Sequence, residues 1–106
     1  MRRRLIVSLL ALLPLAPASA QNIPQIDFER TCRELTRSPE RITGFRRCVS
    51  DERSARDELA RVWSSFAPAD RRECAALTGI GGSPSYVQLL ECLDMTREDQ
   101  NERAKQ

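Results

Sequence analysis

Histidine is absent from the 106-residue sequence. This residue is the commonest general base in enzymes and the usual partner of a serine or cysteine nucleophile, so most hydrolase mechanisms are excluded. Ser83 and Ser85 are therefore interpreted as helix-start residues, and the adjacent carboxylates at 51–52 and 57–58 diverge along a predicted helix. The glycine-rich stretch 79–82 lacks the lysine and the Ser/Thr of a phosphate-binding loop. We predict no catalytic residue, no bound cofactor and no enzyme activity.

Two further patterns are missing from the sequence. Alternation of apolar and polar residues, which indicates a half-buried strand, does not occur, while Arg, Glu, Leu and Ala are abundant and favour helices. The sequence also has no apolar run of the roughly 20 residues that a membrane-spanning helix needs. We therefore expect an all-α protein without a membrane span.

The first 20 residues have the three parts of an export signal peptide. Arg2–Arg4 form a basic start, residues 5–13 form the apolar core, and Ala18–Ala20 supply small residues before the cleavage position. We expect cleavage before Gln21, export by the general secretory route, and a periplasmic or secreted location in a bacterium.

Charge is balanced in the chain that follows this leader. Three of the 17 basic residues lie in the leader and none of the 15 acidic ones does, so residues 21–106 carry 14 basic and 15 acidic groups, a formal charge of −1. The two signs are interleaved, which gives no signal for nucleic acid or for an anionic membrane surface. The length allows one small helical domain, which we place at 21–96, followed by a charged solvated tail at 97–106.

Apolar spacing and the positions of proline predict four helices. They span 24–37, 39–66, 68–77 and the segment from Ser83-Pro84 to Met95. Ser38-Pro39 and Ser83-Pro84 are each expected to provide an N-cap and a proline in the first turn, and the chain is expected to fray after Met95. The predicted core consists of Phe45, Leu59, Trp63, Phe66, Leu77, Tyr86, Leu90 and Leu93.

Charged residues gather in the middle of the second predicted helix. Glu52 with Arg56, and Asp57 with Arg61, stand four residues apart, which is the spacing of ion pairs on a helix surface. This face is interpreted as solvent-exposed rather than as a binding or catalytic surface.

Four cysteines, Cys32, Cys48, Cys74 and Cys92, lie in two similar segments that read Cys-x-x-Leu-Thr, a gap, Ser-Pro and Cys. Gaps of 15, 25 and 17 residues do not resemble the close ligand pairs of a zinc site, so no metal is predicted. The Cys-x-x-Cys of a redox centre is also missing. In a short exported chain such cysteines are expected to form structural disulfides.

Each cysteine segment predicts a helical hairpin whose two cysteines face each other, which favours the pairs Cys32–Cys48 and Cys74–Cys92. Cys48 and Cys74 lie too far apart along neighbouring helices for a bridge, which tolerates Cα separations of about 4.4–6.8 Å. The crossed arrangement, Cys32–Cys74 with Cys48–Cys92, stays open. The predicted fold class is a small, disulfide-stapled four-helix domain built as two helical hairpins.

A distinctive combination of residues lies between Cys48 and Met95. It consists of Cys48, Asp51-Glu52, Ala55-Arg56, Leu59, Trp63, Phe66, Pro68, Cys74, Pro84-Ser85-Tyr86-Val87, Leu89-Leu90, Cys92-Leu93 and Met95. With these residues the segment resembles a group of small exported, four-cysteine helical bacterial proteins of unknown function. The resemblance covers more than half of the chain after the leader. It implies a shared exported, helical, cysteine-bearing domain and supplies no catalytic residue.

The sequence favours a non-catalytic interaction or accessory module that binds an envelope or periplasmic protein. One alternative is a carrier for a small apolar ligand, and another is a periplasmic redox or carboxylate-based enzyme. Trp63, Phe66 and Tyr86 are assigned to the core, with contact to a partner as their alternative role. The sequence names neither the partner nor an oligomeric state.

Overall fold

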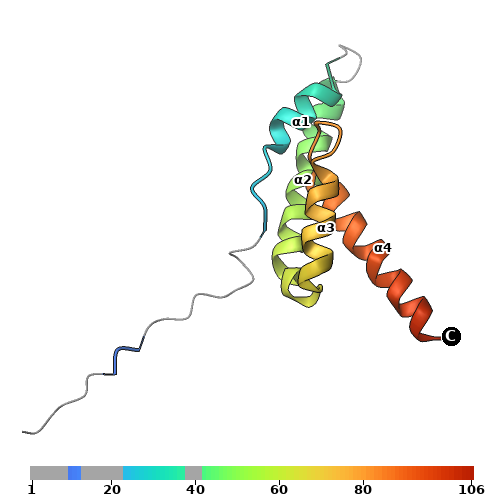
Figure 1. The fold of residues 1–106 in the computed structure, drawn as a ribbon. Coiled ribbons are helices and arrows are strands. Elements are labelled where there is room, and N and C mark those ends of the chain that lie inside the picture. Colours follow the sequence, from blue (N-terminus) through green and yellow to red (C-terminus); the bar gives the residue numbers. More distant parts are fainter. Residues whose placement is uncertain (1–9, 13–22, 38–41) are drawn as a thin grey trace, which may run out of the picture.

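The computed structural model describes residues 10–12, 23–37 and 42–106 (Figure 1). Their helices are α1 (Phe28–Leu35), α2 (Ile42–Val62), the 3-10 turn η3 (Trp63–Ser65), α3 (Pro68–Thr78) and α4 (Tyr86–Ala104). These described residues contain no strand, so the predicted all-α, four-helix architecture is confirmed. The predicted helix start at Ser38-Pro39 lies outside the described residues.

The breaks between helices follow from proline and glycine. Pro68 is the first residue of α3, where its missing N–H costs no helical hydrogen bond, and Ala67 before it is extended with ψ 140°. The turn from α3 to α4 uses Gly81 and Gly82 at φ 93° and 82°, a region that side chains disfavour.

The start of α4 corrects the sequence prediction. Ser83 was expected to cap the helix with Pro84 in its first turn, but the N-cap is Ser85, whose Oγ accepts a hydrogen bond from Gln88 N at 3.3 Å. Pro84 therefore precedes the helix. The backbone of Ser85 is extended, as is typical of an N-cap residue, and its side chain therefore reaches a free N–H of the first turn.

The helices form two disulfide-linked hairpins. The Cys32–Cys48 bridge joins α1 to α2, and the Cys74–Cys92 bridge joins α3 to α4, with Cα–Cα distances of 5.7 Å in both. Helix α1 packs against α2, while α4 packs against both α2 and α3 (Figure 1). The favoured pairing is confirmed, and the crossed pairing is excluded.

The core lies where α1, α2, η3, α3 and α4 meet. Its cluster of buried apolar residues comprises Phe28, Ala55, Leu59, Trp63, Phe66, Cys74, Tyr86, Leu89 and Leu93. Five of the predicted core residues belong to this cluster: Leu59, Trp63, Phe66, Tyr86 and Leu93.

Three predicted core positions need correction. Leu77 is 50% exposed, Phe45 is half-buried away from the main cluster, and Leu90 is only partly buried at its edge. Helix α4 instead turns Tyr86, Leu89 and Leu93 inward, which is the i, i+3, i+7 face of the helix.

Helix α4 also extends further than predicted. The chain was expected to fray after Met95, but the helix continues to Ala104 through the predicted boundary at residue 96. The guanidinium Cζ of Arg97 lies 3.9 Å from the centroid of the Phe66 ring. Nη2 of the same arginine donates a hydrogen bond to Ser65 Oγ at 2.7 Å. Gln100 Nε2 donates to Asp70 Oδ2 at 3.1 Å. Polar side chains thus extend the packing of a helix that has few apolar residues in this part.

Within the described ranges, no helix combines the length and the apolar character required to cross a membrane.

The orientation of α4 can be tested with two leucines. Leu89 has no exposed surface, whereas Leu77 is half exposed. Leu89→Ala is expected to lower the free energy of unfolding by about 2–5 kcal/mol because it leaves a buried cavity, and Leu77→Ala by about 0.5 kcal/mol. Urea unfolding followed by circular dichroism, with the disulfides intact, measures both. Equal losses in the two variants would contradict this orientation.

Candidate functional site

The four cysteines are all consumed by disulfides, so the chain has no free thiol. Cys32 is fully buried and Cys74 is 2% exposed. Among the residues that the structure describes, no group of three or more His, Cys, Asp or Glu side chains is placed to hold a metal ion. The cysteines therefore act as structural links.

A buried carboxylate, Glu52, lies at the start of α4. Its side chain comes from the middle of α2 and only 4% of the residue is exposed. Oε2 accepts a hydrogen bond from the backbone N–H of Tyr86 at 2.7 Å, and Oε1 accepts one from the hydroxyl of Ser85. The free N–H groups and the positive end of the dipole at a helix N-terminus both stabilise a carboxylate there.

This placement overturns the prediction that Glu52 pairs with Arg56 on an exposed face. The ion pair that Arg56 makes among the described residues is with its neighbour Asp57, at 3.8 Å. The helical periodicity predicted for α2 is correct. Glu52 was assigned to the surface because it is charged, and this assignment is wrong. A buried carboxylate is stable here because donors from another helix surround it.

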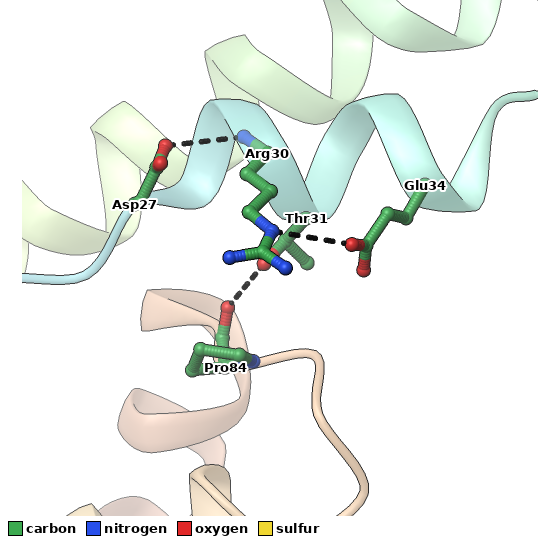
Figure 2. A network of polar contacts seen from close by, with 5 residues as sticks. All are labelled: Asp27, Arg30, Thr31, Glu34 and Pro84. Carbon is green, nitrogen blue, oxygen red and sulfur yellow. Dashed lines mark hydrogen bonds and ion pairs between the residues drawn. The ribbon is translucent and has the colours of Figure 1, made fainter.

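Further hydrogen bonds converge on residues 84–86. Thr78 Oγ1 donates to the carbonyl oxygen of Ser85 and accepts from its N–H, both at 3.1 Å. Thr31 Oγ1 of α1 donates to the carbonyl oxygen of Pro84 at 2.8 Å, and Figure 2 shows this contact between the two hairpins. The same view shows α1 held by its N-cap Asp27 and by the exposed Arg30–Glu34 pair.

Tyr86 extends the same cluster toward the N-terminal segment. Its hydroxyl donates to the carbonyl oxygen of Pro24 at 2.7 Å and accepts from Ile26 N–H at 3.0 Å. Its ring contacts Phe28 edge-on, with centroids 6.0 Å apart. We call Thr31, Glu52, Thr78, Ser85 and Tyr86 the junction cluster.

The hydroxyl of Ser85 is enclosed within the junction cluster. The hydroxyl of Ser85 donates to Glu52 and accepts from Gln88 N–H, and the residue is 6% exposed. A nucleophile needs access to substrate and a base that is free to take its proton. Ser85 lacks that access, in agreement with its interpretation as a helix-start residue.

A second arrangement has unpaired polar groups. A surface hollow of about 320 Å³ is lined by Pro24, Trp63, Pro68, Arg71, Arg72 and Ala75. We call it the Trp63 hollow. Among the described residues, the indole Nε1 of Trp63 and the guanidinium Nε of Arg71 are buried without a hydrogen-bond acceptor. The guanidinium of Arg71 lies against the indole, with Cζ 5.6 Å from the ring centroid.

The three aromatic residues considered as partner contacts are all buried. Trp63 and Tyr86 are each 2% exposed and Phe66 is 6% exposed, which confirms their assignment to the core. Of the three, Trp63 lines a surface hollow. The arginines beside Trp63 were not predicted, because basic and acidic residues are interleaved along the sequence. The adjacent pair Arg71-Arg72 at the start of α3 was the available signal.

Comparison of the chain with protein-family models, with curated proteins and with solved structures found no match.

The contribution of the junction cluster can be measured by removing its carboxylate. Glu52→Ala leaves two buried donors without an acceptor and is expected to lower the free energy of unfolding by about 2–4 kcal/mol. Glu58→Ala is the matched control, because Glu58 is exposed on the same helix, and its change is expected to stay within about 0.5 kcal/mol. Equal stability of the two variants in urea unfolding would refute the role assigned to Glu52.

Proposed function

We propose that this protein is exported to the bacterial periplasm or beyond and acts there as a non-catalytic interaction module for an envelope protein. The basic, apolar and small-residue parts of the first 20 residues support export, and so do two disulfides in a short chain. The resemblance of residues 48–95 to small exported bacterial proteins points the same way.

The observation that carries the interaction role is the contrast between the junction cluster and the Trp63 hollow. Inside the junction cluster, each buried hydroxyl and the carboxylate has a partner within the chain. At the Trp63 hollow, two buried N–H donors have no acceptor among the described residues. Buried donors are normally satisfied, so two unpaired donors at a surface hollow support a role for an acceptor from another molecule.

The alternative functions have less support. A carrier for a small apolar ligand needs an apolar cavity, whereas the side chains of Leu59, Leu89 and Leu93 fill the space between the helices and have no exposed surface. A redox enzyme needs a reactive thiol, and the four cysteines are bridged. A carboxylate-based enzyme needs two facing carboxyl groups, and Glu52 faces hydroxyl and backbone donors instead.

Native mass spectrometry of the protein isolated from its own cell envelope tests this proposal. We expect a chain that begins at Gln21, has four hydrogens fewer than the reduced form, and is recovered partly as a complex with a second protein. A denaturing spectrum provides the control for chain mass. A retained small molecule in place of a protein would favour the carrier. An uncleaved leader or four free thiols would contradict export.

A further inference from the structure

We infer that the Trp63 hollow binds a carboxylate side chain from a peptide segment of the partner protein, beside a small apolar side chain of the same segment. This inference rests on the proposed interaction function and specifies its site. Three independent properties of the hollow support it, namely its unpaired donors, its unbalanced charge and its apolar surface.

The unpaired donors require an acceptor. Trp63 is 2% exposed and lines the hollow, and its Nε1 has no partner among the described residues. The same holds for Nε of Arg71, which lies against the indole ring. An indole N–H can only donate, and a guanidinium offers five donors and no acceptor. Both donors belong to residues that line the hollow, so an oxygen acceptor bound there would lie beside them.

The charge around the hollow indicates an anionic acceptor. Within the described part of the chain, Arg71 and Arg72 form no ion pair, and no acidic residue lines the hollow. Two other hollows differ, because Asp57 lines one beside Arg46 and Arg53, and Asp51 and Glu52 line the other beside Arg47. Residues 1–22, which come before the lining residue Pro24 in the sequence, contain no Asp or Glu.

A carboxylate fits these donors best. The planar fork of arginine matches the two oxygens of a carboxylate, and charge-assisted hydrogen bonds of this kind are stronger than neutral ones. The first turn of α3 already carries Asp70, so the two arginines, and not the helix N-terminus, supply the positive charge of the hollow.

The apolar part of the hollow favours a peptide ligand over an inorganic anion. Pro24, Pro68 and Ala75 give the hollow an apolar part, and a volume of about 320 Å³ accommodates a few side chains. An inorganic anion would leave this apolar surface in contact with water. A peptide that carries an apolar residue next to Glu or Asp would cover it while its carboxylate reaches the arginines.

The test uses Trp63, the single tryptophan of the chain, as a fluorescent reporter. The protein, expressed with its own leader and purified after export, is titrated with acetyl-Val-Glu-Val-amide and with its Gln counterpart. We expect a saturable change in Trp63 fluorescence with the Glu peptide and at least tenfold weaker binding of the Gln peptide, because one charge-assisted hydrogen bond is worth about tenfold in affinity.

Two variants locate the binding. Arg72 is exposed, so Arg72→Gln is expected to fold normally and to weaken binding of the Glu peptide about tenfold. The double variant R71Q/R72Q is expected to weaken binding of this peptide further. The matched control is R46Q/R47Q, an adjacent exposed pair on α2, which is expected to bind within about twofold of the unmodified protein. Circular dichroism of each variant verifies the fold.

Several results would overturn this inference. Equal binding of the Glu and Gln peptides, unchanged binding by Arg72→Gln, or no fluorescence change would each refute a carboxylate site. Saturation by acetate or inorganic phosphate at the same concentration as the peptide would refute peptide selection. If native mass spectrometry still finds a protein complex and R71Q/R72Q leaves it intact, the site is wrong and the interaction function stands. If no complex is found either, both proposals fail.

Discussion

The carboxylate of Glu52 at the N-terminus of α4 is the interaction on which the rest of the fold depends. Each disulfide closes a hairpin internally, so neither bridge fixes the position of one hairpin relative to the other. That position is set by the apolar core and by the hydrogen bonds that Glu52 and Thr31 make to residues 84–86. A carboxylate suits this position because the helix end offers both free N–H groups and a favourable dipole.

This division of roles explains why the proposed binding site lies outside the junction cluster. The hydrogen-bonding groups of the junction cluster are satisfied within the chain, so they have little left to offer a ligand. The Trp63 hollow is formed instead by η3, by the start of α3 and by Pro24, which the Tyr86 hydroxyl holds in place. The hollow therefore carries donors that have no acceptor among the described residues.

The sequence predicted four helices and favoured the two observed disulfides, because apolar periodicity, proline positions and cysteine spacing are local signals, but it left the crossed pairing open. It did not predict the burial of Glu52, since a glutamate among charged neighbours has the same pattern whether it faces water or another helix. Leu77 was assigned to the core because periodicity defines an apolar face without showing which helix will cover it. The Trp63 hollow depends on residues from three segments, so no single stretch of sequence reveals it.

The order of the two disulfides bears on how the chain matures. Cysteines that are neighbours in the sequence pair with each other, the first with the second and the third with the fourth. In a chain that emerges from an export channel with its N-terminus first, Cys32 and Cys48 are both available to an oxidant before Cys74 emerges. Oxidation in order of emergence therefore produces the native connectivity directly, without a step of disulfide isomerisation. In a chain exported as we propose, docking of the two hairpins would then wait only for the last helix to leave the channel.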